Sequence, residues 1–452
     1  MHAHRRQLIA LARPVYFSLL ATVAAGIINT VWVSRLGGAA VAAVAVATNA
    51  ENVLLGVSLV FASGTTVLVA HARGARDPGA VRAAVRGGWA LYGVVTPVVV
   101  LAGSALREPL ARLVLGADDG PAVPLAVAYF TISLPGIAVF FAQNLVDGIL
   151  KGAGDTRTPM RLALLANGLI LVCDPFLIQV YGVRGAAVST VLCRCVALAA
   201  GIVVLRRNTL LRTAVAVRAS ESTGRALRRT LTTGLPMSAD FTVRQGGALV
   251  LVAVVARLGV TAVAAYSIAY KVMYVATMAF YSVRQAASIH TAHTRGAGRR
   301  GSPASAEAGS GGELRAIGRQ AVLVSGAAGV VAVVLLGVTA PWVMDAFGAG
   351  PEVAHAGVVF LRCVGPYLLL MACFIALGGV FEGSRGAPVL LRVTVLGTAV
   401  QLPLAHLLSG LGLPGVCLAL ALAMAVQCAA LGVLFRRAGR QEEAEVSLAR
   451  VA

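Results

Sequence analysis

Long apolar runs dominate the chain, and short clusters of Arg, Gly, Pro and acidic residues separate them. A helix needs about 20 mostly apolar residues to cross a bilayer. Twelve runs come close to this length, so the pattern predicts an all-α integral membrane protein with twelve spanning helices. Their approximate ranges are 12–34, 43–71, 84–106, 123–149, 159–181, 185–205, 231–256, 262–292, 317–345, 354–381, 388–409 and 414–435.

Composition supports a membrane protein and excludes a soluble one. Of the 452 residues, 58% are hydrophobic and only 12% are charged, whereas soluble domains carry about 25% charged residues. No Ser/His/Asp arrangement and no phosphate-binding G-K-[ST] loop is present in the sequence, so an enzyme is not expected. The seven cysteines are scattered through apolar stretches and are interpreted as packing residues.

The net charge of +20 is distributed unevenly between the connections. Arginines gather at the N-terminus, in alternate loops, in the central segment 206–229 and near the C-terminus. Basic loops face the cytoplasm, which predicts cytoplasmic termini in the inner (plasma) membrane; a nucleic-acid partner is not expected. The segment 295–315 is rich in Gly, Ser and Ala and is predicted to be a flexible loop.

The sequence contains an internal repeat. Residues 33–47 match 255–269 at nine of fifteen positions, with an offset of 222, and Pro14 matches Pro236 at the same offset. A second pair is G-I-L-K-G at 148–152 and G-V-F-E-G at 379–383. The repeat predicts two six-helix lobes of parallel topology, residues 1–218 with a basic linker and residues 219–452 with a short tail. Such repeats are typical of transporters that work by alternating access.

Several motifs, taken in order, resemble the multidrug and toxic compound extrusion (MATE) family, and its DinF-like branch in particular. They are the repeated R-L-G-x-x-A-V-A-A, G-I-L-K-G-A-G-D-T-R-T-P at 148–159, D-P-F-L-I at 174–178, G-V-R-G-A-A-V-S-T at 182–190 and G-L-P at 234–236. The resemblance implies a V-shaped pair of lobes that expels amphipathic organic compounds in exchange for protons or sodium.

Four carboxylates fall within the predicted spans, where a charge is costly and therefore a functional candidate. They are Glu51, Asp147, Asp174 and Asp240. Glu51 either faces the substrate cavity or pairs with an Arg of its own lobe. Asp147 is either functional or paired with Lys151, one helical turn later.

Asp174 is the strongest candidate for proton coupling. Burial favours the neutral form of a carboxyl group, and Pro175 beside it removes a helical hydrogen bond. The resemblance implies a proton site here, with Asn144 and Thr190 nearby. Two positions depart from the family pattern. Asn29 replaces a usual Asp, and Ile170 stands where the family usually has an Asn one turn before Asp174, although Asn167 lies almost one turn further back. The alternative is an Asp that only ties helices together by hydrogen bonds.

The second half carries basic residues at predicted cavity positions. Arg244 stands where the sodium-coupled branch has a Glu, so the expected coupling ion is the proton, with no cofactor. Asp240 precedes Arg244 by one turn, which predicts an ion pair. Lys271, between Tyr270 and Tyr274, is predicted to be a second buried cation. Together with Arg284, these basic residues are compatible with an anionic or zwitterionic substrate.

The predicted function is export of an amphipathic drug or natural product against protons, by a protein that works as a monomer. The predicted substrate-cavity residues are Glu51, Asp240, Arg244, Lys271 and Tyr270, and the predicted coupling residues are Asp174, Asn29, Asn144, Asn167 and Thr190. A metal site at His290 and His293 is not expected, because the sequence offers no third ligand nearby. Two alternatives remain: a flippase for a lipid-linked precursor, and a relative that has lost transport.

Overall fold

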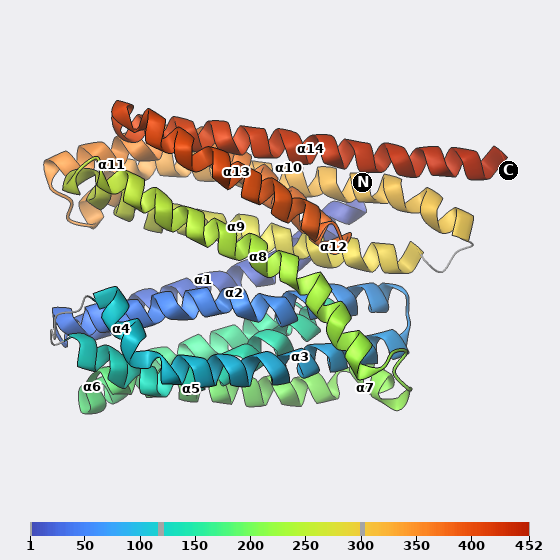
Figure 1. The fold of residues 1–452 in the computed structure, drawn as a ribbon, viewed down its shortest axis with the longest axis horizontal. Coiled ribbons are helices and arrows are strands. Elements are labelled where there is room, and N and C mark those ends of the chain that lie inside the picture. Colours follow the sequence, from blue (N-terminus) through green and yellow to red (C-terminus); the bar gives the residue numbers. More distant parts are fainter. Residues whose placement is uncertain (1, 116–121, 299–302, 452) are drawn as a thin grey trace. The chain divides into compact units, whose positions relative to one another are not determined.

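The structure is a computed structural model that describes residues 2–115, 122–298 and 303–451, and these residues form helices and short turns (Figure 1). The elements are α1 (His2–Ser34), α2 (Gly38–Gly74), α3 (Pro78–Ala105), α4 (Arg107–Leu115), α5 (Ala122–Gly152), α6 (Arg157–Arg207), α7 (Thr209–Ala216), α8 (Thr223–Ala256), α9 (Val260–Gly298), α10 (Pro303–Ala346), α11 (Pro351–Cys363), α12 (Gly365–Gly383), α13 (Ala387–Leu408), η1 (Ser409–Leu411) and α14 (Gly412–Val451). The all-helical prediction is therefore confirmed.

The described residues contain ten helical segments that are long and apolar enough to span a membrane. Two of these segments each hold two of the twelve predicted spans. The long helix α6 is broken at Gly182, where φ is 59° and ψ is −136°, a conformation that glycine adopts without steric cost. Similarly, α13 and α14 lie in one segment, Ala387–Arg437, interrupted by η1.

The prediction of a flexible loop at 295–315 is wrong for the part of this segment that the structure describes. Helix α9 continues to Gly298, and α10 begins at Pro303. Pro is favourable in the first turn of a helix, and the alanines that follow are strong helix formers. Residues 299–302 lie outside the described residues.

The chain divides into two compact units: an N unit, Phe17–Ser238, and a C unit, Met1–Tyr16 with Ala239–Ala452. These boundaries differ from the predicted division between residues 218 and 219, because α1 and α8 each contribute residues to both units. Both helices are divided two residues after a proline, Pro14 or Pro236, and the two boundaries are 222 residues apart. The internal repeat therefore extends to the place where each helix changes unit.

In the N unit, α2 packs against α5, and α5 packs against α6 (Figure 1). Gly148 permits close approach of α5 to α2, because a Cβ atom there would lie 2.8 Å from the Ala62 carbonyl oxygen. The Thr66 hydroxyl also donates to the Gly148 carbonyl oxygen over 3.0 Å. Phe61 and Phe141 are fully buried beside this contact.

The C unit repeats this packing with α9 and α12. Gly379, the counterpart of Gly148, lies against the backbone carbonyl of Arg284 on α9. Gly383 likewise lies against the carbonyl of Ser288. The buried core around these helices includes Phe280 and Phe360. The glycine pairs of the repeated motif therefore serve the same purpose in both units: they bring two helix backbones together.

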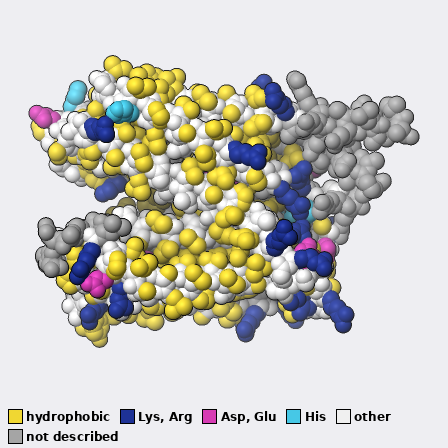
Figure 2. Space-filling view, viewed as in Figure 1, with side chains coloured by type: hydrophobic (Ala, Val, Ile, Leu, Met, Phe, Trp, Pro, Cys, Tyr) yellow, Lys and Arg dark blue, Asp and Glu magenta, His cyan; other side chains and the backbone are white. Residues whose placement is uncertain are grey.

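Hydrophobic side chains cover much of the surface of each unit, and Lys and Arg side chains lie mainly near the helix ends (Figure 2). On α6, Phe176, Val180 and Tyr181 are each more than 60% exposed. Water does not favour such extensive apolar exposure. The surface agrees with a multi-pass membrane protein whose helices face lipid.

Candidate coupling and substrate sites

Asp174 is wholly buried in the N unit. It lies on α6, and the Asn29 side chain of α1 donates from Nδ2 to its Oδ2 over 2.7 Å. The other carboxylate oxygen, Oδ1, is buried and has no hydrogen-bond partner among the described residues. Within that same part of the chain, no Lys or Arg forms an ion pair with Asp174. The acid is therefore held by a neutral amide and carries one unused oxygen.

A second polar contact joins the same two helices. Asn167 donates from Nδ2 to the Thr22 hydroxyl over 3.4 Å. In both contacts the paired residues are 145 positions apart, a constant separation that shows α1 and α6 running parallel. Asn167 lies seven residues before Asp174, and its side chain contacts α1 instead of Asp174.

The other two predicted coupling residues make different bonds. Asn144 donates from Nδ2 to the Ser58 hydroxyl over 3.2 Å. The Thr190 hydroxyl donates to the Ala186 carbonyl oxygen over 3.0 Å. Among the described side chains, only Asn29 of the four predicted neutral partners has a hydrogen bond to Asp174.

Glu51 forms an ion pair within its own unit, one of the two alternatives that the sequence left open. Its Oε2 lies 3.5 Å from Nη1 of Arg194, and both side chains are about one-fifth exposed. The Arg194 guanidinium also lies over the Phe140 ring, 4.6 Å from its centroid. The buried Tyr129 lies within electrostatic range of this pair and of Asp174. Sequence reasoning missed Arg194 and Tyr129.

Asp147 has no ion pair within 4.0 Å in the described part of the chain, and its Oδ1 is buried without a hydrogen-bond partner there. Lys151 is nevertheless close enough to attract it electrostatically. Asp147 thus differs from Asp174, which has only a neutral amide as its partner.

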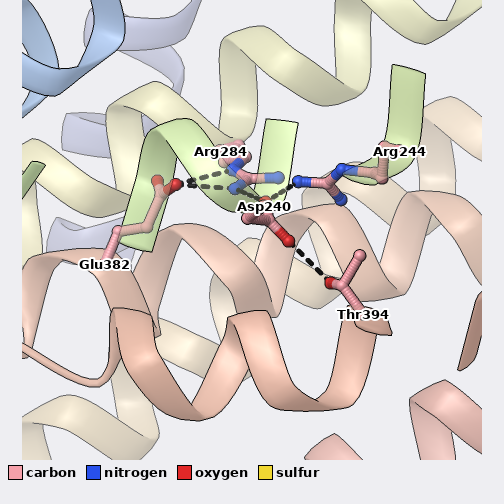
Figure 3. Close-up of polar contacts among 5 residues, drawn as sticks. All are labelled: Asp240, Arg244, Arg284, Glu382 and Thr394. Carbon is pink, nitrogen blue, oxygen red and sulfur yellow. Dashed lines mark hydrogen bonds and ion pairs between the residues drawn. The ribbon is translucent and has the colours of Figure 1, made fainter. Parts of the chain in front are cut away.

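A network of buried charges occupies the C unit (Figure 3). Asp240, on α8, is wholly buried. It pairs with Arg244 on the same helix, as predicted, and also with Arg284 of α9, whose Nη2 lies 2.7 Å away. The Thr394 hydroxyl of α13 donates to its other oxygen over 2.6 Å. Three helices are therefore tied together through one carboxylate.

Arg284 joins a second carboxylate to this network. Its Nε and Nη2 donate to Oε1 of Glu382, on α12, over 3.1 and 2.6 Å. The sequence reasoning named Arg284 only as a basic residue and missed Glu382 as a partner. The signal that could have found Glu382 was its place in G-V-F-E-G, the counterpart of G-I-L-K-G, where Lys151 stands.

Two further predictions concern α9. The prediction that Lys271 is a buried cation is wrong, because its side chain is exposed; a long lysine stem readily carries its ammonium group outward. Tyr270 stacks with Tyr266 at a centroid distance of 5.8 Å, and Tyr274 follows at 6.4 Å from Tyr270. The three rings form a row along the helix.

Histidines do not assemble a metal centre in the described residues, which contain no group of three His, Cys, Asp or Glu suited to a metal ion. His290 is buried, and its Nε2 lies 2.9 Å from Nδ1 of His4 on α1. This bond helps fix the start of α1 to the C unit, where Leu8 and Ala12 also pack.

Spanning helices, a repeated unit and a buried polar centre in each unit define an all-α, multi-pass membrane protein. A family model described as MatE matches residues 14–176 and 236–407, and the chain belongs to this family. Family members are transporters rather than enzymes.

Individual relatives agree with the family. The chain is 27% identical over 208 residues to "Probable multidrug resistance protein YpnP" of Bacillus subtilis, covering 45% of this chain and 46% of the relative. It is 30% identical over 200 residues to "Probable multidrug resistance protein NorM" of Thermotoga maritima, covering 42% of each. The chain thus spans less than half the length of the curated relatives it matches.

The fold agreement covers nearly the whole chain. A crystal structure of a MATE protein in complex with MaL6 superposes with a TM-score of 0.88 over 97% of both chains, at 21% identity. The two-lobe fold of the family is therefore the fold of this protein.

Proposed function

We propose that the protein is a secondary exporter that moves an amphipathic organic compound outward in exchange for protons, by alternating access. The multidrug resistance names of its relatives support the organic substrate. The proposal places the protein in the plasma membrane as a monomer, with both termini in the cytoplasm, and in the DinF-like branch. The basic connections support this orientation.

The observation that carries proton coupling is the isolation of Asp174. Glu51, Asp240 and Glu382 each have an arginine partner. Asp174 has no arginine or lysine partner among the described residues; it accepts a hydrogen bond from the Asn29 amide, and its Oδ1 has no hydrogen-bond partner there. The charge of a buried carboxylate is most costly where no cation lies beside it. Binding a proton removes that charge, so among these four carboxylates Asp174 is the one that a proton would stabilise most.

Proton binding would change how α1 is held. The ionised carboxylate accepts a hydrogen bond from Asn29, whereas the protonated group needs an acceptor for its own O–H. The contact partner is α1, which shares a second contact with α6 at Thr22 and Asn167. Loss of charge at Asp174 thus weakens one of two polar ties between these helices. A substrate would be released if it prefers the deprotonated form.

Sodium coupling is less well supported. In the C unit, Arg244 occupies a position within the carboxylate network and brings a positive charge to it. The two carboxylates of this network, Asp240 and Glu382, are already paired with arginines. A sodium ion there would have to displace a guanidinium group, which the proposal does not require.

The test is ethidium flux in proteoliposomes under an imposed pH gradient and, separately, a sodium gradient. Wild type and Asp174→Asn are compared with Asp147→Asn, which removes a carboxylate from the same unit. The expected result is flux driven by the pH gradient and abolished only in Asp174→Asn. Flux driven by sodium alone, or unchanged flux in Asp174→Asn, would refute proton coupling at this residue. Flux of a lipid-linked precursor but not of ethidium would favour the flippase, and flux of an organic anion such as carboxyfluorescein but not of ethidium would favour an exporter of anionic compounds. No flux of any of the three would favour a relative that has lost transport.

A further inference from the structure

Arg244 has hydrogen-bond donors that the protein itself does not use. Its Nη2 contacts Asp240, one turn earlier on α8. Its Nε and Nη1 are buried, and neither has a hydrogen-bond partner in the described part of the chain. A buried donor without an acceptor is unfavourable, so these nitrogens favour any ligand that brings an oxygen acceptor.

The carboxylates beside Arg244 are not available to a positively charged ligand. Asp240 accepts hydrogen bonds from Arg284 and Thr394 in addition to its contact with Arg244. Glu382 accepts two from Arg284. Two carboxylates therefore face two guanidinium groups (Figure 3), and the network offers an organic cation no net negative charge.

Access to the network also favours an anion. The Asp240 side chain is 1% exposed and that of Arg284 is 9% exposed, whereas that of Arg244 is 19% exposed. Arg244 is thus the most exposed charged side chain of the network, and the Glu382 side chain follows at 11%. Solvent therefore reaches this guanidinium group more than either carboxylate of the network.

Aromatic side chains lie around the same guanidinium. Phe374 has its ring centroid 5.9 Å from the Arg244 guanidinium carbon. Tyr367 lies within electrostatic range of Arg244 and of Tyr270, and Tyr270 is the middle ring of the row that continues to the 43%-exposed Tyr274. Flat aromatic surfaces favour aromatic ligands through offset or edge contacts.

We propose that Arg244, Tyr270, Tyr274 and Tyr367 form an anion site in the C unit, which takes a carboxylate, sulfonate or phosphate group carried on an aromatic or other apolar body. A guanidinium group binds such oxyanions through paired hydrogen bonds. The site rests on the proposed function in one respect: it assigns the exported compound to amphipathic anions or zwitterions. Arg284 holds Asp240 when Arg244 turns its free donors to the ligand.

The test is equilibrium binding, which does not depend on transport. Fluorescence anisotropy measures carboxyfluorescein, an aromatic anion, and ethidium, an aromatic cation, on the purified full chain in detergent. Wild type is compared with Arg244→Gln and Arg244→Lys, and with Arg257→Gln, which removes an exposed arginine from the same unit. Thermal unfolding of each variant verifies that the C unit is intact.

Wild type is expected to bind carboxyfluorescein more tightly than ethidium. Arg244→Gln should weaken carboxyfluorescein binding about tenfold or more, Arg244→Lys should give an intermediate loss because it keeps the charge but not the planar donors, and Arg257→Gln should change nothing. If wild type does not bind carboxyfluorescein, or if Arg244→Gln and Arg244→Lys both fold and bind it as wild type does, the anion site is wrong.

Two further experiments are added. The first distinguishes a lipid headgroup from a free compound as the source of the anion, and the second tests the anion site separately from the proposed function. Phosphatidylglycerol in mixed micelles that displaces carboxyfluorescein identifies a lipid headgroup as the natural ligand, and failure to displace it identifies a free compound; either outcome supports the site. Anion binding that survives in Asp174→Asn, with or without pH-driven flux in wild type, supports the site independently of proton coupling. Ethidium flux by a wild type that shows no anion binding would overturn the site and leave the exporter in place.

Discussion

Asp240→Asn should destabilise the C unit, because it removes one charge from a balanced group of four. The carboxylate is wholly buried and contacts Arg244, Arg284 and Thr394. Asparagine has nearly the same shape but no charge. After the change, Arg284 keeps its ion pair with Glu382, whereas Arg244 loses Asp240, the carboxylate with which it pairs, and is left without a counterion.

The magnitude follows from that imbalance. Removing one partner of a buried ion pair costs about 3–5 kcal/mol, and the lower end applies because the partly exposed Arg244 can turn towards solvent. For a unit of roughly 200 residues, each kcal/mol lowers the midpoint of unfolding by about 2–4 °C. Asp240→Asn should therefore lower the midpoint by about 6–12 °C.

The assay is the thermal unfolding of detergent-solubilised protein, followed by the amount of monodisperse protein left after heating. Asp345→Asn, which removes an exposed carboxylate from the same unit, should leave the midpoint unchanged. The double variant Asp240→Asn with Arg244→Gln restores charge balance and should recover at least half of the loss. A single variant within about 2 °C of wild type, or a double variant no more stable than the single, would refute the argument from charge balance.

Three other changes test separate parts of the structure. Asn29→Leu removes the amide that donates to Asp174, and pH-driven flux should fall several-fold while the protein stays folded; unchanged flux would show that this bond has no role in coupling. Gly379→Val forces a side chain into the backbone of α9 and should cost about 1–3 kcal/mol, whereas Gly337→Ala, with open space around it, should be neutral or stabilising by up to about 1 kcal/mol; thermal unfolding compares them. Arg194→Met leaves Glu51 without its cation and should lower the unfolding midpoint, and a second change, Glu51→Gln, should restore it; failure of that rescue would mean that the pair contributes nothing.

The fold could be predicted from the sequence because its signals are local or repetitive. Apolar runs long enough to span a membrane and the repeated R-L-G-x-x-A-V-A-A motif can both be identified directly in the sequence. The structure contains the corresponding long helices and two units. The break at Gly182 was also predicted, between the ranges 159–181 and 185–205. The exchange of the first parts of α1 and α8 between units was not predicted, because it depends on which neighbour a helix packs against.

The candidate sites were predicted less completely, for a related reason. The ion pair between Asp240 and Arg244 follows from helical spacing, and Asp174 followed from its charge within an apolar run. The partners Arg194 for Glu51 and Glu382 for Arg284 lie 143 and 98 residues away along the chain, and helical periodicity carries no information over such distances. The burial of Lys271 was mispredicted because it was inferred from the hydropathy of its neighbours, whereas the structure leaves this residue exposed.

The exchange of helix segments has a consequence for the ancestry of the chain. The C unit includes residues 1–16 and the N unit includes residues 223–238, so neither half of the gene encodes a complete unit by itself. A single ancestral copy would have left Leu8 and Ala12, or their counterparts Thr230 and Gly234, without the surface on which they now pack. The simplest ancestor is a six-span chain that paired with an identical copy by exchanging its first helical turns. Fusion of two such copies would allow the halves to diverge, so that the C unit holds the network of Asp240, Arg244, Arg284 and Glu382 at a place where the N unit has no counterpart network among the described residues.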